Sequence, residues 1–400
     1  MKKFLLPLLT MLTFLFVVGT VPIYAEEDQK KETTEEENSD ELKLAENSKS
    51  ALLLERDTGK ILYEKNAHEK LPPASMTKIM TLVLIMEALE DEKIKLDETV
   101  RISDYAASMG GSQIFLEAGE EMIVKDLLKG VAVASGNDAS VALAERIAGS
   151  EQAFVRMMNE KAKMLGLENS LFQNTTGLPA ENHYTTAYDM ALMAKELLKY
   201  EEITEYTSIY EDYLRKDTED EFWLVNTNKL VKFYDGVDGL KTGYTSEAKY
   251  CLTATAKKNG MRTVAVVMGA DTPKKRNSDV SQMLDYAFNH FDTKQLFQSK
   301  QPISKLDLIK ADKNNVDIVT EESVSLVHKK GEKLEGIKTT IKVNQDIVLP
   351  LKKGDKVGEL VVELDGKVLS ETSLIIDQDV EKAGLWTLFK RSMDEIVKKG

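Results

Sequence analysis

The feature that most constrains the fold of this chain is a long apolar run that begins with a serine and a lysine. After a pair of prolines, the residues from Ser75 to Glu90 read SMTKIMTLVLIMEALE. A helix that is apolar on nearly every side is buried in a core. Ser75 and Lys78 are three residues apart, so their side chains lie on the same face of this predicted helix. The sequence therefore predicts a hydroxyl and an amine side by side near the start of a core element.

The serine and lysine together have a chemistry available to them. A buried amine tends to lose its proton, and a neutral amine can accept the proton of a neighbouring hydroxyl, which makes the hydroxyl a nucleophile. An ordinary helix start with a solvent-facing lysine fits the same short pattern, so the pattern alone does not establish a catalytic site. A second copy, Ser246 to Lys249, follows a predicted strand and heads no apolar helix, and we assign it no function.

Composition limits the classes of function that remain. With 400 residues, of which 42% are hydrophobic and 30% charged, the chain is a globular protein long enough for two domains. A formal net charge of −14 and the lack of a basic stripe argue against a nucleic-acid partner. The single cysteine, Cys251, excludes an internal disulfide, and with the four histidines it matches no metal-ligand spacing. We therefore expect neither a metal nor a cofactor, and chemistry carried by Ser, Lys, Asn, Thr and Arg side chains.

The first residues predict export. Lys2 and Lys3 precede the apolar run from Phe4 to Val18, which is typical of a signal peptide over residues 1–25. An uncleaved N-terminal anchor is the alternative, although the apolar run is short for a membrane span. Residues 26–47 carry ten acidic residues and three lysines with almost no apolar side chains, which predicts a disordered acidic spacer.

The middle of the chain predicts helices that pack against an antiparallel sheet. Short strands bounded by turn residues, the last two joined by an Asn-Gly hairpin, are expected at 51–54, 61–63, 237–245, 250–256 and 262–268. Helical periodicity is present at 121–134, 139–148, 151–165, 186–200 and 279–291. Asp138 is expected to cap the second of these helices, and residues 100–121 are expected to be mostly irregular.

The C-terminal part of the chain has a different character. From residue 301 to 378, short runs of Val, Ile and Leu alternate with glycine-containing turns, which predicts a small all-β domain. Residues 379–400 predict an amphipathic helix that is too short and too charged to span a membrane but suited to lie in its interface. Packing of this helix against the β domain is the alternative. Its apolar stripe consists of Leu385, Leu388, Phe389, Met393, Ile396 and Val397, flanked by Trp386 and by the basic residues Lys382, Lys390, Arg391, Lys398 and Lys399.

Two further polar clusters strengthen the interpretation of the serine–lysine pair as a catalytic site. Ser135-Gly136-Asn137 follows a predicted helix, Lys241-Thr242-Gly243 lies on a predicted strand, and each occurs once. A Ser-x-x-Lys pattern followed by clusters of these two kinds, in this order, is the motif set of β-lactamases and penicillin-binding proteins. Gly243 would let a substrate backbone approach the strand closely.

Within that group, the chain resembles the low-molecular-mass penicillin-binding proteins, the serine-type D-alanyl-D-alanine carboxypeptidases of the peptidase S11 family. The resemblance covers roughly residues 48–397 and includes the opening strand pair, Phe172-x-Asn174-x-x-Gly177-Leu178, and the segment from Asp238 to Thr245. It implies an α+β fold. A β-lactamase/transpeptidase-like catalytic domain at 48–300, with an antiparallel sheet and helices, would precede the small all-β domain and the amphipathic helix.

The resemblance implies acyl transfer in cell-wall maturation. Ser75 would attack the carbonyl between two D-alanines at the end of a peptidoglycan stem pentapeptide, with Lys78 as general base, and β-lactam antibiotics would acylate the same serine. The backbone N–H groups of Ser75 and Tyr244 would form the oxyanion hole. Some members carry histidine where this chain has Tyr244, which should matter little because a backbone group is used there.

The resemblance also implies the remaining roles and the location. The enzyme would be exported and held at the outer face of the bacterial cytoplasmic membrane by its C-terminal helix. Ser135 would relay a proton, and Asn137 would bind the substrate amide. Lys241 would supply a positive potential. Thr242 and Arg276 would bind the terminal carboxylate. A surface arginine in the basic run 274–276 is the alternative for Arg276.

Two other functions remain open on the sequence. A class A-like serine β-lactamase would share the three clusters, and Glu168 lies roughly where such an enzyme carries the glutamate that activates water. However, Phe172 stands where an asparagine would complete that motif. A non-catalytic, membrane-bound wall-binding protein that keeps only the fold is the second alternative. Penicillin turnover and D-alanine release would distinguish the three.

Overall fold

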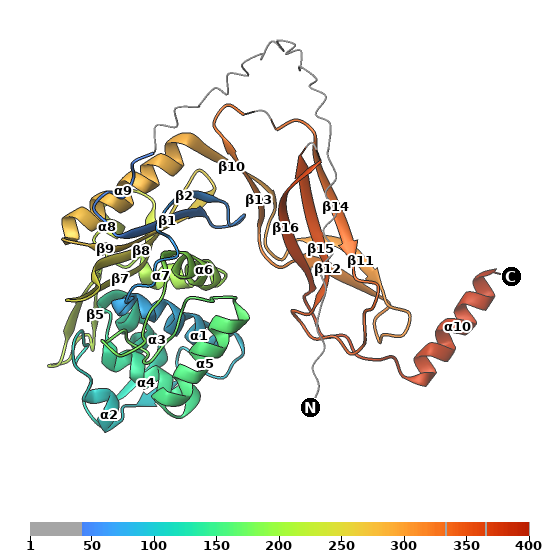
Figure 1. Cartoon of the computed structure of the whole chain (residues 1–400). Helices are drawn as coiled ribbons and strands as arrows, with labels where there is room; N and C mark the ends of the chain where they lie inside the picture. The colour runs from blue at the N-terminus through green and yellow to red at the C-terminus, as the bar shows by residue number, and fades with distance from the viewer. Residues whose placement is uncertain (1–41, 333, 365, 400) are drawn as a thin grey trace, which may run out of the picture. The chain divides into compact units, whose positions relative to one another are not determined.

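The computed structural model describes residues 42–332, 334–364 and 366–399 (Figure 1). The predicted signal peptide at 1–25 and the predicted spacer as far as residue 41 lie outside the described residues.

The folded part of the chain begins earlier than the sequence predicted. Ala45, which we had placed in the spacer, is buried in the core on one face of the central sheet. The side chains of Asn47 and Ser48 donate hydrogen bonds of 2.8 and 2.6 Å to the buried carboxylate of Asp279. Residues 43–47 are therefore part of the folded domain, because a buried carboxylate needs such donors.

A five-stranded antiparallel sheet forms the centre of this domain (Figure 1). Its strands, in the spatial order β2-β1-β9-β8-β7, are β2 Ile61–Lys65, β1 Ser50–Glu55, β9 Met261–Ala270, β8 Lys249–Lys258 and β7 Val237–Thr245. The five predicted strands are thus present, and β7 has the predicted bounds. Asn259 and Gly260 both have positive φ, 50° and 82°, as the predicted Asn-Gly hairpin requires.

Helices cover both faces of the sheet. Along β1, Leu52 and Leu54 belong to one apolar cluster while Ala51 and Leu53 belong to another, because successive side chains of a strand point to opposite faces. The helix α9 (Pro273–His290) packs on the second face. The first face carries α6 (Ala187–Leu197) and, beyond it, most of the remaining helices of this domain (Figure 1).

The apolar run after Ser75 forms the buried helix that the sequence predicted. The helix α1 (Lys78–Glu90) contacts α4, α5 and α6, and its residues from Lys78 to Met86 are all buried. The remaining helices and short strands of this domain are β3 Thr99–Arg101, α2 Asp104–Ala107, β4 Glu121–Ile123, α3 Val124–Lys129, α4 Asn137–Ala148, α5 Glu151–Met164, α7 Ile203–Thr207, β5 Glu211–Leu214, β6 Phe222–Val225 and α8 Leu230–Phe233.

Two predictions in this region were wrong in detail. The helix expected at 121–134 starts three residues later, because Glu121–Ile123 forms the strand β4. This strand pairs with β3, which lies at the start of the stretch we expected to be irregular. Asp138 is not an N-cap. It lies in the first turn of α4, where its carboxylate accepts hydrogen bonds from the backbone N–H groups of Ile114 (3.0 Å) and Leu116 (3.1 Å).

The C-terminal part is all-β, as predicted, but begins at Phe291 rather than near residue 301. Its strands form a five-stranded sheet in the order β11-β12-β16-β15-β14 and a two-stranded sheet of β10 and β13. Their bounds are β10 Phe291–Phe297, β11 Pro302–Asp307, β12 Asn315–Thr320, β13 Val324–Lys329, β14 Ile337–Val343, β15 Lys356–Leu364 and β16 Lys367–Ile376. The chain ends in the helix α10, Leu385–Lys399.

Candidate active site

The expected nucleophile lies on a tight turn that leads into the core helix. Ser75 is in the 3₁₀ turn η1 (Ala74–Thr77), which runs directly into α1. The strand β7 packs against this turn at Gly243, where a Cβ atom would lie 2.7 Å from the carbonyl oxygen of Pro73. Glycine is therefore required there by the protein's own turn, whereas the sequence suggested an approach by substrate. This contact fixes Ser75 beside the strand that carries Lys241-Thr242-Gly243.

Lys78 is fully buried at the start of α1 and has three polar neighbours. Its Nζ atom lies 3.4 Å from the Ser75 hydroxyl, 2.6 Å from Oδ1 of Asn137 and 2.8 Å from the carbonyl oxygen of Thr176. Burial holds the pKa of the Lys78 amine well below its usual value, and the positive charge of Lys241 lowers this pKa further. The sequence-predicted pair is thus together, and its amine favours the neutral form that can accept a proton.

Asn137 links the second cluster to this pair. Its Nδ2 atom donates a 2.6 Å hydrogen bond to the carbonyl oxygen of Gly110, and its backbone N–H donates one of 2.7 Å to that of Ser112. Gly111 passes so close that a Cβ atom there would lie 2.8 Å from Asn137 Nδ2. The loop at 110–112, in the stretch that the sequence predicted to be mostly irregular, therefore holds the Asn137 amide in place.

Ser135 has an unusual backbone and an unused hydroxyl. It follows a π-helical turn, η2 (Gly130–Ala134), and has φ 63° and ψ 32°, a left-handed conformation that non-glycine residues rarely adopt. Its Oγ atom is buried and forms no hydrogen bond within the described residues. A buried hydroxyl without a partner is costly, so this geometry is consistent with a group kept for substrate.

The third cluster places two cations near each other. The Lys241 side chain is buried on β7, and its pKa is lowered to about 7, first by burial and second by the guanidinium of Arg276. Arg276 itself is buried in the first turn of α9 and donates two hydrogen bonds, of 3.0 and 2.8 Å, to the side chain of Asn277. The interpretation of Arg276 as a surface residue is therefore wrong.

Thr242 and Tyr244 flank Gly243 on the same strand. The Thr242 hydroxyl donates a 2.8 Å hydrogen bond to the hydroxyl of Thr227, a residue that the sequence did not single out. The Tyr244 ring is 54% exposed and stacks on the ring of Tyr250 with 4.4 Å between centroids. The oxyanion role expected of Tyr244 concerns its backbone N–H and does not depend on this ring contact.

The turn at 174–177 was given no role by the sequence, although its residues belong to a motif that carries the family resemblance. The Oδ1 atom of Asn174 accepts hydrogen bonds from the backbone N–H groups of Thr176 (3.2 Å) and Gly177 (2.7 Å), which shapes a tight turn. This turn directs the Thr176 carbonyl toward Lys78. Gly177, with φ 84°, lies against η1, where a Cβ atom would be 1.8 Å from the carbonyl oxygen of Ala74. A backbone carbonyl carries no sequence signature, so this partner of Lys78 could not be predicted.

His183 braces the turn that carries Ser75. Its Nε2 atom lies 2.8 Å from the hydroxyl of Thr77, and the Gln173 N–H donates to its Nδ1 at 3.3 Å. Burial lowers the pKa of His183 to about 4, so the ring is neutral near pH 7 and donates to Thr77. We had noted this histidine only as part of a set that matched no metal site.

Glu168 and the second Ser-x-x-Lys copy, both weighed in the sequence, are not among the residues that form hydrogen bonds with the side chains of Ser75 or Lys78. Glu168 is exposed in the turn that follows α5, and no side-chain hydrogen bond or ion pair joins it to another described residue. The second Ser-x-x-Lys copy forms the turn between β7 and β8, where Lys249 is exposed with φ 57°. Among the described residues, no three His, Cys, Asp or Glu side chains are grouped closely enough to hold a metal ion.

The chain matches two family models and is similar to known proteins over most of its length. Residues 33–272 match the peptidase S11 model, described as D-alanyl-D-alanine carboxypeptidase, and residues 291–382 match the model for the C-terminal domain of penicillin-binding protein 5. Over 355 residues, the chain is 58% identical to the D-alanyl-D-alanine carboxypeptidase DacF of Bacillus subtilis, which covers 89% of this chain and 91% of that protein.

The chain is also similar to solved structures of penicillin-binding proteins. Penicillin-binding protein 5 from Haemophilus influenzae is similar with a TM-score of 0.65 and 32% identity, covering 85% of this chain and 98% of that one. Penicillin-binding protein D2 from Listeria monocytogenes, solved in the ampicillin-bound form, is similar with a TM-score of 0.53 and 31% identity, over 62% of this chain and 99% of that one. The predicted fold class, a mixed α and β catalytic domain followed by a β domain, is thus confirmed.

The contact at Gly177 gives a testable prediction. In Gly177→Ala, the new methyl group would overlap the Ala74 carbonyl, so η1 or the turn at 174–178 must move. Because a displacement of about 1 Å can cost about a hundredfold in rate, we expect acylation of Ser75 by benzylpenicillin to slow by about that factor. The rate of adduct formation, followed by mass spectrometry, measures this.

A matched control is Gly166→Ala. Gly166 also has a positive φ, 69°, but no atom lies within 4 Å of a Cβ atom built there. The control should lose about 1 kcal/mol of stability through backbone strain and keep the wild-type acylation rate. Equal acylation rates in the two variants would contradict a role for close packing at Gly177.

Proposed function

Because the chain belongs to the peptidase S11 family of D-alanyl-D-alanine carboxypeptidases, we infer that it removes the terminal D-alanine from peptidoglycan stem pentapeptides through an acyl-enzyme on Ser75. β-Lactam antibiotics would acylate the same serine, since their reactive carbonyl meets the same nucleophile. The observation that carries this proposal is the buried Lys78 amine beside the Ser75 hydroxyl, at 3.4 Å.

The hydrogen-bond inventory of Lys78 supports its role as general base. A neutral amine has two N–H donors and one lone pair. The carbonyl oxygens of Asn137 and Thr176, at 2.6 and 2.8 Å, accept the two N–H groups. The lone pair is then left for the proton of the Ser75 hydroxyl. On this proposal, Ser75 attacks the carbonyl between the two D-alanines as Lys78 takes its proton, and the leaving D-alanine amine receives a proton through Ser135.

The strand β7 supports the proposed binding mode. It is at the edge of its sheet, so its outer side can pair with an extended peptide. The backbone N–H groups of Ser75 and Tyr244 would stabilise the oxyanion, a contribution of about 3 kcal/mol in comparable enzymes. Asn137 would bind the substrate amide through the second hydrogen of its Nδ2 group. Gly243 lets η1 and β7 lie close together, which an oxyanion site shared by the two donors would require.

The terminal carboxylate would be bound by the third cluster. Lys241 and Arg276 concentrate positive charge there, and Thr242 contributes a hydroxyl. A guanidinium can bind a carboxylate with two parallel hydrogen bonds, which suits Arg276 to this task. On acylation the carboxylate leaves with D-alanine, and water then hydrolyses the acyl-enzyme.

We also propose that the domains divide the work as the sequence suggested. The domain with the central sheet carries catalysis, the β domain acts as a spacer, and α10 holds the exported protein at the outer face of the cytoplasmic membrane. Leu385, Trp386 and Phe389 support this, being 87%, 77% and 57% exposed. Among the described residues, no helix has both the length and the apolar character to cross a membrane.

Arg391 has a different contact from the one we expected. Its guanidinium donates to the carbonyl oxygens of Ile309, Ala311 and Asp312, at 3.2, 2.6 and 2.7 Å. It is therefore engaged with the β domain and not with lipid headgroups. This contact ties α10 to that domain and leaves the exposed apolar residues of its first turns available for a membrane surface.

The nucleophile variant tests the proposed reaction. Wild type should release D-alanine from a pentapeptide ending in D-Ala-D-Ala and form a slowly released stoichiometric adduct with penicillin. Ser75→Ala should do neither, because the attacking oxygen is gone. Glu168→Gln, which removes an exposed carboxylate, should behave as wild type. Rapid penicillin turnover that depends on Glu168 would instead favour a β-lactamase, and no D-alanine release by wild type would favour a wall-binding protein.

The two buried lysines give a pH dependence. The neutral form of Lys78 is the base, so kcat/KM for D-alanine release should fall as the pH falls through its lowered pKa. The cationic form of Lys241 attracts the carboxylate, and it loses its proton above a pKa of about 7. We therefore expect kcat/KM to fall by about tenfold as the pH rises beyond this value. Lys241→Arg stays charged to higher pH and should lose this alkaline limb. An unchanged alkaline limb in that variant would rule out the assignment to Lys241.

A vesicle-binding measurement tests the membrane proposal. The double variant Trp386→Ser, Phe389→Ser should sediment less with vesicles that contain anionic lipid than wild type, because it buries less apolar area in the interface. D-Alanine release from a soluble peptide should not change. Phe233→Ser, which removes an aromatic ring 71% exposed on the catalytic domain, is the matched control and should bind as wild type. Equal sedimentation of all three proteins would contradict the proposal.

A further inference from the structure

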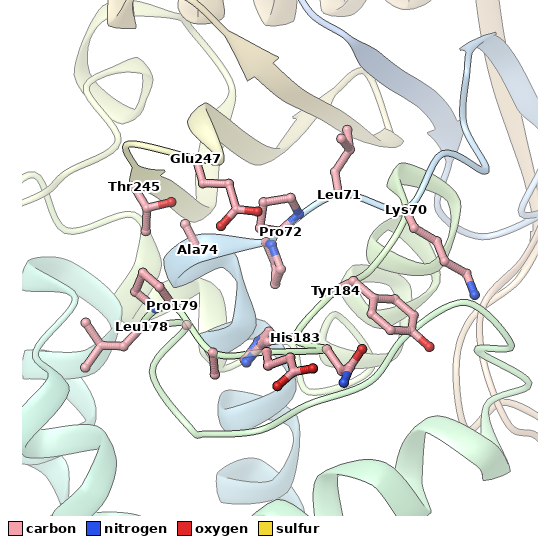
Figure 2. A pocket seen from close by; sticks show the side chains of 15 residues that line it. Lys70, Leu71, Pro72, Ala74, Leu178, Pro179, His183, Tyr184, Thr245 and Glu247 are labelled. Carbon is pink, nitrogen blue, oxygen red and sulfur yellow. The ribbon is translucent and has the colours of Figure 1, made fainter.

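A cavity of about 610 Å³ opens next to the turn that carries Ser75. Three segments line it: residues 70–74 before the nucleophile, the loop at 177–184, and the end of β7 with the turn that follows (Figure 2). No role in the proposed reaction has yet been assigned to it.

The position of the cavity relates it to the path of a bound peptide. Ala74, which precedes Ser75, and Thr245, which follows Tyr244, both line it, so it begins one residue beyond each proposed oxyanion donor. The proposed carboxylate contact, Thr242, lies on the other side of Tyr244 along β7. A peptide with its carboxylate at Thr242 and its reacting carbonyl at Ser75 therefore continues along the strand edge toward the cavity. The residue that precedes the two D-alanines is the part that reaches it.

The cavity wall is apolar close to the serine. The side chains there are those of Pro72, Pro73, Ala74, Leu178 and Pro179. Prolines hold the backbone in place, so this part of the wall is largely preformed. Such a surface suits the methylene groups of an aliphatic side chain.

The charged groups of the cavity differ in whether they are engaged. The Lys70 amine lies 4.7 Å from the centroid of the Tyr184 ring, a cation–π contact. The two carboxylates of the cavity, Glu181 and Glu247, take part in no side-chain hydrogen bond or ion pair within the part of the chain that the structure describes, and Glu181 belongs to the loop at 177–184. Glu247 follows the end of β7, along the proposed path of the peptide. It is presented by the turn after β7, which is held by a 3.0 Å hydrogen bond from the Ala248 N–H to the Thr245 hydroxyl. Figure 2 shows its carboxylate directed toward Pro72 and Ala74.

We propose that Glu247 is a specificity-determining residue, which favours substrates whose residue before the two D-alanines carries a side-chain ammonium. The apolar wall takes the methylene groups of that side chain, and the Glu247 carboxylate pairs with the ammonium at its end. This inference rests on the proposed function, because it assumes that the peptide reacts at Ser75.

Two peptides that differ in one group test the proposal. Both end in D-Ala-D-Ala, and the preceding residue is lysine in one and Nε-acetyl-lysine in the other, which removes the charge. Because Glu247 is exposed, the expected preference of wild type for the free amine is about two- to fivefold in kcat/KM. Glu247→Gln should lose this preference and hydrolyse the acetylated peptide at the wild-type rate.

Two controls make the result specific. Glu168→Gln removes an exposed carboxylate of the same domain away from the cavity and should keep the preference. Acylation of Glu247→Gln by benzylpenicillin, which lacks an ammonium, should proceed at the wild-type rate and show that the catalytic groups are intact.

Each outcome decides a different point. Equal kcat/KM of wild type for the two peptides, or an undiminished preference in Glu247→Gln, would overturn the role of Glu247 and leave the proposed function standing. A lack of D-alanine release from both peptides by wild type would overturn the proposed function and this inference together.

Discussion

The burial of one amine determines how the rest of the active site is built. A fully buried ammonium is strongly disfavoured, and the Lys78 amine responds with a lowered pKa. Its neutral form still needs acceptors for two N–H groups, and bulk solvent cannot reach the amine to provide them. Asn137 and Thr176 provide them, and each comes from a segment far away in the sequence. The serine hydroxyl receives the one position on the amine that remains.

These acceptors explain features of the fold that otherwise look unrelated. The Thr176 carbonyl points inward because Asn174 shapes its turn and because Gly177 can pass against the Ala74 carbonyl. The Asn137 side chain is held by Gly110, in a loop that Asp138 in turn fastens at Ile114 and Leu116. The glycines and Asp138 thus fix the groups that bind Lys78 without contact with substrate. The negative charge of Asp138 itself raises the pKa of Lys78, against the larger effects of burial and of Lys241.

The sequence predicted those parts of the structure that depend on a repeating pattern. The buried helix α1 was found from a run of apolar residues, and the strands of the central sheet were found as short segments bounded by turn residues. The strand β7 has the bounds that were expected. Short elements were missed or misplaced. Glu121–Ile123 was taken as helix because three residues are too few to reveal the alternation of a strand, and the start of the folded domain was obscured by the acidic composition around Ala45.

Within the site, sequence reasoning found side chains but not the backbone groups on which they depend. In the structure, Lys78 contacts Ser75 and Asn137 and is affected by the charge of Lys241. The resemblance had pointed to these four residues and also to Ser135 and Arg276. The Thr176 carbonyl and the Thr227 hydroxyl were absent from that set. A carbonyl has no residue type, and a lone threonine in a loop is too common to stand out. Such partners become visible when the chain is folded.

The site contains buried positive charge, although the chain as a whole is negatively charged. The protein has a formal net charge of −14, yet Lys241 and Arg276 are both buried, and the guanidinium of Arg276 lowers the pKa of Lys241. An anionic substrate would relieve this repulsion and favour the protonated form of Lys241, since an opposite charge raises the pKa of an amine. The charge of Lys241, in turn, lowers the pKa of Lys78. On the proposed roles, the carboxylate of the substrate therefore keeps Lys241 protonated and balances its charge, while burial remains the main cause of the lowered pKa of Lys78.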